Sequence, residues 1–487
     1  MQTAASIAEG VASGRVRATD VLAACAARHR DTDARLNALV QPRWMEAAAE
    51  ATAVDAARRG GLAGVPVSVK ECFAVRGLRT TLGIESRRDE RDLDDAAAVA
   101  RLREAGAIIV GKTNVPQAMY LHETDNPVWG RTVHPLAPDR SPGGSSGGDA
   151  ALVAAGVVPL GLGNDLAGSL RQPAHACGIA ALMPRSAAFG DGGAFDTMPQ
   201  LAVVRPRAGF LAAEVGDLRL ALRHVAAAAA PQDRVGPLSI GWWDDAGPIA
   251  ASPAVVRGVA EAVARLRNAG ATVTRLDSAI ATEAAWLHLA ILAADGGRQV
   301  RALYHGARPM PGVGRLLRIA GMPRGLRPFV AAAIRLTGRG LEAQALVATG
   351  PRRGREFDRL LEARARLATR YAALVAGYDA IVCPVSALPA LRHGTAARLI
   401  LAAAPCLLAN LLDLPAGAVP VTTVRPDEEQ GRGSLRDPVL RDAVHTDRGS
   451  RGLPVGVQVV GGPVADESLV LDVMQAIEGR VTIPAGP

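Results

Sequence analysis

Apolar and polar positions alternate along this chain in a way that favours strands interleaved with helices. Short apolar runs typical of buried strands occupy residues 65–69, 107–110, 157–162, 379–384 and 455–460. Residues 97–105 carry apolar side chains at helical spacing, and residues 240–277 repeat the order of strand, helix and strand. This alternation predicts an α/β fold with a largely parallel sheet.

The first sixty residues are predicted to be helical. Val21 and Cys25 lie one helical turn apart, and residues 45–59 are rich in Ala and Glu. We expect these helices to pack on the core that follows. No internal repeat or linker is visible apart from a charged loop at residues 425–451, so we expect a single domain over residues 1–487.

The composition is typical of a compact α/β enzyme, which we expect in the cytoplasm, either free or peripheral to the membrane. Of the 487 residues 49% are hydrophobic, and the five cysteines are scattered without a CxxC pair. Neither a disulfide framework nor a thiolate metal site is therefore expected. The nine histidines show no metal-ligand spacing, so we predict neither a metal nor a cofactor. The uncharged runs are shorter than the roughly 20 residues that cross a membrane.

Only Lys70 and Lys112 are lysines among the 55 basic residues. Arginine stays charged, whereas a buried lysine can lose its proton and act as a base, so each lysine is either a candidate for such chemistry or has no special role. Lys112 also completes a match to the phosphate-binding pattern GxxxxGK[ST] at residues 106–113. We reject this match because the Ala-Ile-Ile-Val between the glycines favours a buried strand over a turn.

Two glycine-rich turns that carry hydroxyl side chains are the strongest candidates for a catalytic site. The first is Ser141-Pro-Gly-Gly-Ser-Ser-Gly-Gly148, and the second is Gly163-Asn-Asp-Leu-Ala-Gly-Ser-Leu-Arg171. Glycine lets backbone amides approach a ligand closely and lets a serine stand clear of its neighbours. A flexible linker is a poor interpretation of the first turn, because it lies between apolar elements and not between domains.

Together with Gly64-Val-Pro-Val-Ser-Val-Lys70, these turns resemble the amidase-signature family of serine hydrolases. The resemblance implies a large twisted mixed sheet between α-helices. It also implies a Ser-Ser-Lys triad in which Ser169 is the nucleophile, Ser145 is the bridging serine after a cis peptide bond, and Lys70 is the base. Ser145 follows Lys70 by 75 residues and precedes Ser169 by 24, which suits this triad.

The same resemblance assigns the oxyanion hole to backbone N–H groups of the second turn. These groups belong to Leu166, Ala167, Gly168 and Ser169. Asp165 and Arg171 flank the turn with opposite charges and form either a supporting ion pair or a solvated one. Ser146 is a further supporting residue.

The second turn and the strand after it depart from the family pattern at three positions. Asn164 and Ala167 stand where the family usually has Thr and Gly, and Met183 stands where it usually has Lys. These changes leave open a reduced activity, as in a catalytically impaired lipid-binding homologue. A Ser-His-Asp triad that uses His175, six residues after the nucleophile, is a rival interpretation that mutation would test.

Within the family, the chain is most similar to the fatty acid amide hydrolase branch. The residues that carry this likeness are 70–73, 113–117, 415–424 and 452–458. The branch implies hydrolysis of fatty or other hydrophobic acyl amides, so we expect a small hydrophobic amide as substrate. The main alternative is the related A-type glutaminase subunit of glutamyl-tRNA amidotransferase, which works with a partner chain.

The net charge of +8 is concentrated in one segment. Residues 296–341 contain nine arginines and no acidic residue, and residues 311–337 mix Arg with Leu, Ile, Met and Phe at roughly helical spacing. Two short amphipathic helices interrupted at Pro323 and Pro328 are predicted here, as a cap that contacts a membrane surface or packs on its own protein. Nucleic acid is not an expected partner because few aromatic side chains are available for base stacking. A homodimer is compatible with these features.

Overall fold

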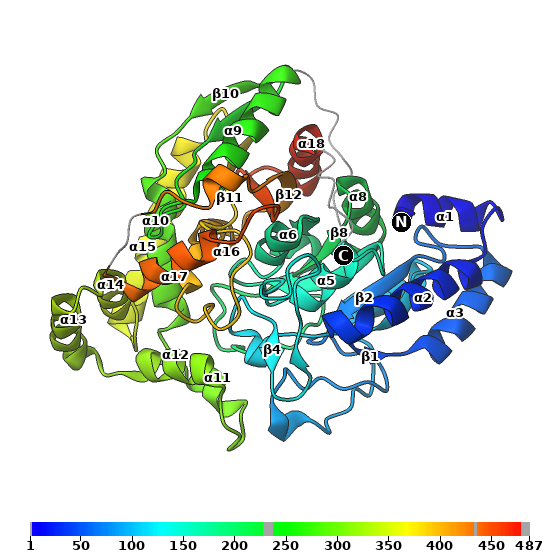
Figure 1. The fold of residues 1–487 in the computed structure, drawn as a ribbon, viewed down its shortest axis with the longest axis horizontal. Coiled ribbons are helices and arrows are strands. Elements are labelled where there is room, and N and C mark those ends of the chain that lie inside the picture. Colours follow the sequence, from blue (N-terminus) through cyan, green and yellow to red (C-terminus); the bar gives the residue numbers. More distant parts are fainter. Residues whose placement is uncertain (1, 227–236, 433–435, 479–487) are drawn as a thin grey trace.

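One sheet of eleven strands forms the centre of the computed structural model, within the residues that it describes, 2–226, 237–432 and 436–478 (Figure 1). In spatial order the strands are β1 (Leu39–Pro42), β3 (Ile108–Thr113), β2 (Pro66–Lys70), β6 (Leu160–Asp165), β8 (Arg207–Ala212), β7 (Ala180–Met183), β12 (Ala416–Thr423), β13 (Pro454–Gly461), β11 (Ala380–Pro384), β9 (Ser239–Trp242) and β10 (Thr272–Arg275). The predicted α/β class is confirmed. Residue 1 and residues 479–487, which the predicted single domain includes, lie outside the described residues.

The sheet is mixed, as the family resemblance implied, so the prediction of a largely parallel sheet from the alternation of strands and helices is wrong for its centre. Strands β3, β2 and β6 are parallel, as are β11, β9 and β10. In between, every neighbouring pair in the order β6, β8, β7, β12, β13 and β11 is antiparallel. The strand–helix–strand repeats that suggested parallel pairing lie towards the two sides of the sheet, whereas the central strands come from segments that are far apart in sequence. The predicted strand at residues 157–162 is found three residues later, as β6.

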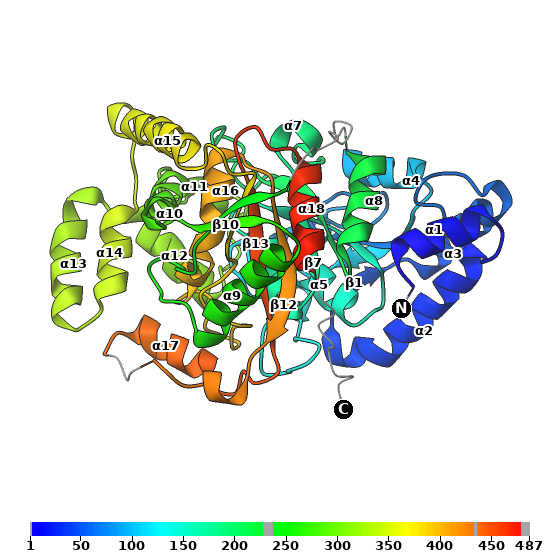
Figure 2. The ribbon, with the colours of Figure 1, turned by 90° about the horizontal axis from the view of Figure 1, so that it is seen from above.

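Helices cover both faces of the sheet, as Figure 2 shows from above. Helices α5 (Gly147–Ala154) and α6 (Arg171–Cys177) pack on one face, against β2, β6, β7, β12 and β13. Helices α8 (Val215–Val225), α9 (Pro253–Asn268) and α18 (Glu467–Ile477) pack on the other face. Both glycine-rich turns lie on the α5–α6 face, because each turn leads directly into one of these helices.

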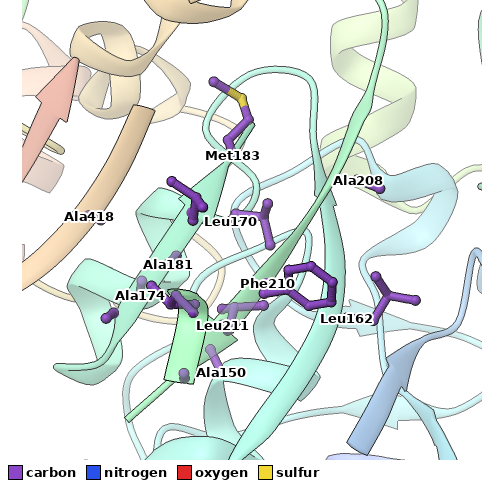
Figure 3. Packing of buried hydrophobic residues seen from close by; sticks show 14 of the residues in the cluster. Ala150, Leu162, Leu170, Ala174, Ala181, Met183, Ala208, Phe210, Leu211 and Ala418 are labelled. Atoms are coloured by element: carbon purple, nitrogen blue, oxygen red, sulfur yellow. The ribbon is translucent and has the colours of Figure 1, made fainter. Parts of the chain in front are cut away.

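A close-packed apolar core underlies the second turn (Figure 3). Leu162 of β6, Phe210 and Leu211 of β8, and Leu170 and Ala174 around the start of α6 are all fully buried. Full burial of a side chain of the size of Leu or Phe contributes roughly 1.5–3 kcal/mol to stability. The turn between β6 and α6 is therefore held at both ends by core residues.

The N-terminal segment is helical except for one strand that the prediction missed. Helices α1 (Ala4–Ala12), α2 (Ala18–Leu36) and α3 (Trp44–Ala57) form the blue end of the molecule in Figure 1. Between α2 and α3, the strand β1 pairs antiparallel with β3 at the edge of the sheet. A strand of four residues is too short for its periodicity to be recognised.

The Arg-rich segment forms helices at the end of the molecule opposite the N-terminal helices, in both views (Figures 1 and 2). These are α11 (Arg298–Ala302), α12 (Pro311–Gly321), the 3-10 helix η3 (Arg324–Leu326), α13 (Arg327–Leu336) and α14 (Gly340–Ala348). The predicted interruptions are confirmed, since α12 ends before Pro323 and Pro328 occupies the first turn of α13.

The remaining helices complete the layers around the sheet. They are α4 (Ala97–Glu104), α7 (Ser186–Phe189), α10 (Ala279–Leu292), α15 (Arg355–Leu374), the 3-10 helix η4 (Ile400–Cys406), α16 (Leu407–Leu412) and α17 (Pro438–Asp447), with the short 3-10 helices η1 (Glu85–Arg87), η2 (Gln117–Met119) and η5 (Pro426–Glu428). Helix α17 lies in the predicted charged loop at residues 425–451, so that prediction is wrong for its second half; residues 433–435 of this loop lie outside the described residues. Among the described helices, none combines the length and hydropathy needed to cross a membrane.

Candidate active site

Lys70 ends strand β2, and its side chain is fully buried. Its Nζ lies 2.8 Å from Ser145 Oγ, 2.6 Å from Asn164 Oδ1 and 3.3 Å from the Asn164 backbone oxygen. A neutral amine has two N–H groups and one lone pair. The two Asn164 oxygens match the two N–H groups as acceptors, and the Ser145 hydroxyl matches the lone pair as a donor. Burial lowers the pKa of Lys70, against the opposing effect of acidic groups including Asp149 and Asp165. The site therefore favours a lysine that can accept a proton.

The two turns that carry Ser145 and Ser169 are hydrogen-bonded to each other. The Gly144–Ser145 peptide bond is cis, and the next residue, Ser146, donates its backbone N–H to the Ser169 carbonyl at 3.1 Å. Ser145 is 2% exposed and Ser169 is 7% exposed. Within the described part of the chain, Ser169 Oγ makes no hydrogen bond, so it is not engaged by a structural partner.

The backbone of the second turn presents three uncommitted N–H groups. Those of Leu166, Ala167 and Ser169 form no hydrogen bond among residues 2–226, 237–432 and 436–478. The Gly168 N–H instead donates to Asp165 Oδ1 at 2.7 Å. Three of the four expected oxyanion donors are therefore free in this structure, and the fourth, the Gly168 N–H, is bonded to the buried Asp165 carboxylate.

Asp165 and Arg171 form a fully buried ion pair, with Arg171 Nε 3.0 Å from Asp165 Oδ2. The solvated alternative is excluded, since neither side chain is exposed. Burial alone would raise the pKa of Asp165, but the Arg171 guanidinium holds that pKa well below its usual range. Arg171 also donates to Asn410 Oδ1 at 2.6 Å and to Gln458 Oε1 at 3.0 Å. This network fixes the turn that carries Ser169.

The three departures from the family pattern are accommodated locally. The Ala167 backbone is outside the left-handed region, and Gly168 supplies the positive φ of the turn, at 95°. Met183 is buried, and its Sδ accepts a hydrogen bond from Asn410 at 3.3 Å. Asn164 is the acceptor for Lys70 described above. None of the three disrupts the turn.

The other candidate residues have structural partners. Both ring nitrogens of His175 contact backbone oxygens, of Gly456 at 3.1 Å and Leu388 at 3.0 Å, so His175 is not placed to activate Ser169. Lys112 lies on β3, as expected from rejecting the phosphate loop, and its Nζ contacts Asp92 Oδ2 at 2.8 Å. Within the described residues, no cluster of His, Cys, Asp and Glu could hold a metal ion.

Sequence reasoning missed several polar residues around the site. Asn410 and Gln458 are more than 200 residues from Arg171 in sequence, and nothing local marks them as its partners. Asp149 accepts a hydrogen bond from Ser68 at 2.7 Å, and burial raises the pKa of Asp149 to about 7. Its position directly after the Gly-Gly-Ser-Ser-Gly-Gly stretch was a signal that could have drawn attention to it.

The chain is similar to known proteins over most of its length. The family model described as Amidase matches residues 20–470. Fatty-acid amide hydrolase 1 of Sus scrofa is 31% identical over 459 residues, which cover 88% of this chain and 77% of that protein. The chain therefore belongs to the amidase-signature family.

Two further likenesses extend over almost the whole chain. The A-type subunit of the glutamyl-tRNA(Gln) amidotransferase of Anaeromyxobacter dehalogenans (strain 2CP-C) is 30% identical, over 98% of this chain and 96% of that protein. A solved structure of a fatty acid amide hydrolase superposes with a TM-score of 0.82, over 98% of this chain and 84% of that chain at 20% identity. At that identity the structural likeness concerns the fold.

Proposed function

We propose that the chain hydrolyses carboxylic amides through an acyl-enzyme on Ser169, with Ser145 and Lys70 as the proton relay. The observation that carries this proposal is the 2.8 Å contact between the buried Lys70 Nζ and Ser145 Oγ. A serine hydroxyl is a weak nucleophile and needs an adjacent base. A buried lysine whose pKa is lowered supplies one.

The reaction is a balanced acyl transfer. Lys70 takes the proton of Ser145, and Ser145 takes the proton of Ser169 while Ser169 Oγ attacks the amide carbonyl carbon. The negative charge on the carbonyl oxygen is stabilised by the free N–H groups of the second turn, each worth on the order of a hundredfold in rate. The C–N bond then breaks, the relay returns its proton to the departing amine, and water hydrolyses the Ser169 ester by the same route.

The proposed substrates are amides with hydrophobic acyl groups. Support comes from the similarity to a fatty-acid amide hydrolase and from the surroundings of the turn. There, Ala167 packs against an apolar cluster of Ala285, Ala404 and Leu407. Such apolar surroundings of the turn favour an uncharged acyl group over a charged one.

The same substrates would partition into membranes, and one part of the surface suits a membrane. We name it the apolar hairpin: Leu326, Phe329, Leu336 and Val347, on η3, α13 and α14, with exposed fractions of 55%, 76%, 91% and 45%. Helices α13 and α14 pack on each other. Exposed apolar side chains on such neighbouring helices favour an interaction surface, and the surrounding arginines favour anionic lipid. We therefore include contact with a membrane surface in the proposed function.

The catalytic part is tested with a series of primary amides and anilides of increasing acyl length, hydrolysed by wild type and Ser169→Ala. We expect turnover to rise with acyl length and to vanish in the variant. Turnover of short amides alone would contradict the proposed substrate class. Equal turnover by Ser169→Ala would contradict the proposed nucleophile.

The membrane part is tested by co-sedimentation with phosphatidylcholine vesicles. Phe329→Asp should weaken binding, whereas Leu93→Asp, at a residue that is 84% exposed outside the hairpin, should not. Equal loss in both variants, or in neither, would contradict docking through the apolar hairpin.

A second candidate function is that of a glutaminase subunit in an amidotransferase. It is favoured by the match to the A-type amidotransferase subunit, which covers nearly the full length of both proteins. This alternative predicts glutamine hydrolysis that depends on a partner subunit. Amide hydrolysis by the purified chain alone would argue against it.

A further inference from the structure

A cavity of about 370 Å³ lies where the Arg-rich cap meets helix α17. Its walls come from α12, the start of α14, the loop before η4, and α17. The starts of α14 and α17 are joined by a hydrogen bond of 3.1 Å from the Leu341 N–H to Asp437 Oδ2. In Figure 1, α12, α14 and α17 lie towards the same end of the molecule as the apolar hairpin. The cavity contains none of the residues of the candidate active site.

The charged residues of this cavity are mostly cations. Its lining includes Arg315, Arg339, Arg398, Arg441, Glu342 and Asp442. His445, one turn after Arg441 on α17, also lines it. Four guanidinium groups thus face two carboxylates, so the lining has an excess of two positive charges with the histidine neutral.

The two carboxylates hold three of the arginines in place but leave most of their N–H groups free. Glu342 accepts from Arg315 at 3.0 Å and also from Arg339, and Asp442 accepts from Arg398. Each of these arginines uses one nitrogen in these contacts. The other N–H groups of a guanidinium remain available, because each group has five.

Two observations show unused donor capacity. Arg441 is exposed, and its guanidinium has no hydrogen bond or ion pair within the described part of the chain. The Nε of Arg339 is buried and also has no partner among the described residues. Arg315, Arg339 and Arg398 are 36%, 36% and 38% exposed, so they are partly shielded from water. Partial shielding strengthens charge-assisted hydrogen bonds to an anion.

We propose that this cavity binds a phosphate-type oxyanion. A planar guanidinium can donate two parallel N–H bonds to two oxygens of a tetrahedral anion. Several guanidinium groups around one cavity can bind different pairs of its oxygens. The anion is either a free phosphate or the phosphate of a lipid headgroup, since the cavity adjoins the cap that carries the apolar hairpin. This inference stands independently of the catalytic proposal.

Isothermal titration of the whole protein with inorganic phosphate, at constant ionic strength, tests the shared chemistry. We expect one saturable site, weakened roughly tenfold by Arg441→Gln. Asp442→Asn should tighten binding severalfold, because it removes a negative charge from the lining of the cavity. Arg15→Gln, at an exposed ion-paired arginine near the N-terminus, should leave binding unchanged. Absence of saturable binding, or equal affinity in wild type and Arg441→Gln, would overturn the proposal.

Vesicles distinguish the two sources of phosphate. If a lipid headgroup occupies the cavity, wild type should prefer vesicles with phosphatidic acid over pure phosphatidylcholine, and Arg441→Gln should lose this preference. If free phosphate occupies it, Arg441→Gln should lose phosphate binding but keep the vesicle preference of wild type. Either result supports the site. Turnover of a short soluble amide should be the same in Arg441→Gln and wild type, which keeps this test separate from that of the active site.

Discussion

Replacing Asn164 with Asp changes one atom beside Lys70 and should change the protonation state of Lys70. Asn164 Oδ1 lies 2.6 Å from Lys70 Nζ, as a neutral acceptor. A carboxylate in the same place would favour the ammonium form of Lys70. The proposed base would then hold its proton at neutral pH, and Ser145 would have nothing to accept its own proton.

The magnitude follows from this distance. Two unit charges 2.6 Å apart attract by about 6 kcal/mol at an effective dielectric constant of 20. Desolvation of the new carboxylate offsets much of that energy, and an adjacent opposite charge typically moves a titration by about 1–3 pH units. We therefore expect kcat/KM of Asn164→Asp to fall roughly 10- to 1000-fold at pH 7 and to recover as the pH is raised.

The assay is the pH dependence of kcat/KM for one soluble amide, between pH 6 and pH 10. Its acid limb should move to higher pH in Asn164→Asp. In Asn164→Thr, which restores the usual residue of the family, it should stay near the wild-type position. A variant that loses activity equally at every pH would refute the reasoning, because it would show a structural defect and not a protonated base. An unchanged profile would show that Lys70 is not the group that limits the rate at low pH.

Three further predictions concern stability. Arg171→Met leaves the buried Asp165 carboxylate without its cation, so the free energy of unfolding should fall by about 3–5 kcal/mol in urea titrations; a loss below 1 kcal/mol would contradict the buried network. Lys112→Met leaves the Asp92 carboxylate without its cation, so the free energy of unfolding should fall by about 3 kcal/mol, but the acid limb of the pH–rate profile should stay in place. Burial lowers the pKa of His288 to about 3. The unfolded state therefore takes up a proton at higher pH than the folded state does, and the free energy of unfolding declines as the pH falls from 6.5 towards 3. His288→Leu should therefore lose about 2–3 kcal/mol less than wild type between pH 7 and pH 4.5, and equal losses would contradict this.

The candidate site was largely predictable because its residues lie within short, distinctive stretches. The glycine-rich turns identify Ser145 and Ser169 through local sequence, and Lys70 stands out in a chain that otherwise uses arginine. The structure adds that the two turns are hydrogen-bonded to each other through Ser146. It also assigns the Gly168 N–H to Asp165, which depends on an orientation of the peptide that residue types do not specify.

The parts that could not be predicted depend on contacts across long sequence separations. Gln458 lies 287 residues after Arg171 and reaches it because β13 occupies the centre of the sheet. The antiparallel centre likewise depends on strands that pair over such distances, whereas periodicity reports only on local structure. Helix α17 was missed for another reason: its many charged residues resemble those of a loop, and its apolar face is short.

The two lysines illustrate why residue type matters at buried cations. Arginine cannot be deprotonated in a protein, so it could match the charge of Lys70 but could never accept the Ser145 proton. Lys112 donates to three acceptors, the Arg79 carbonyl, Thr80 Oγ1 and Asp92 Oδ2, at 2.7–2.8 Å. A compact ammonium group satisfies three such acceptors in a fully buried site, where a planar guanidinium needs more space and a different geometry. In the proposed mechanism Lys70 is needed because it can lose a proton, whereas Lys112 suits its site by its shape, although both are buried in the same sheet.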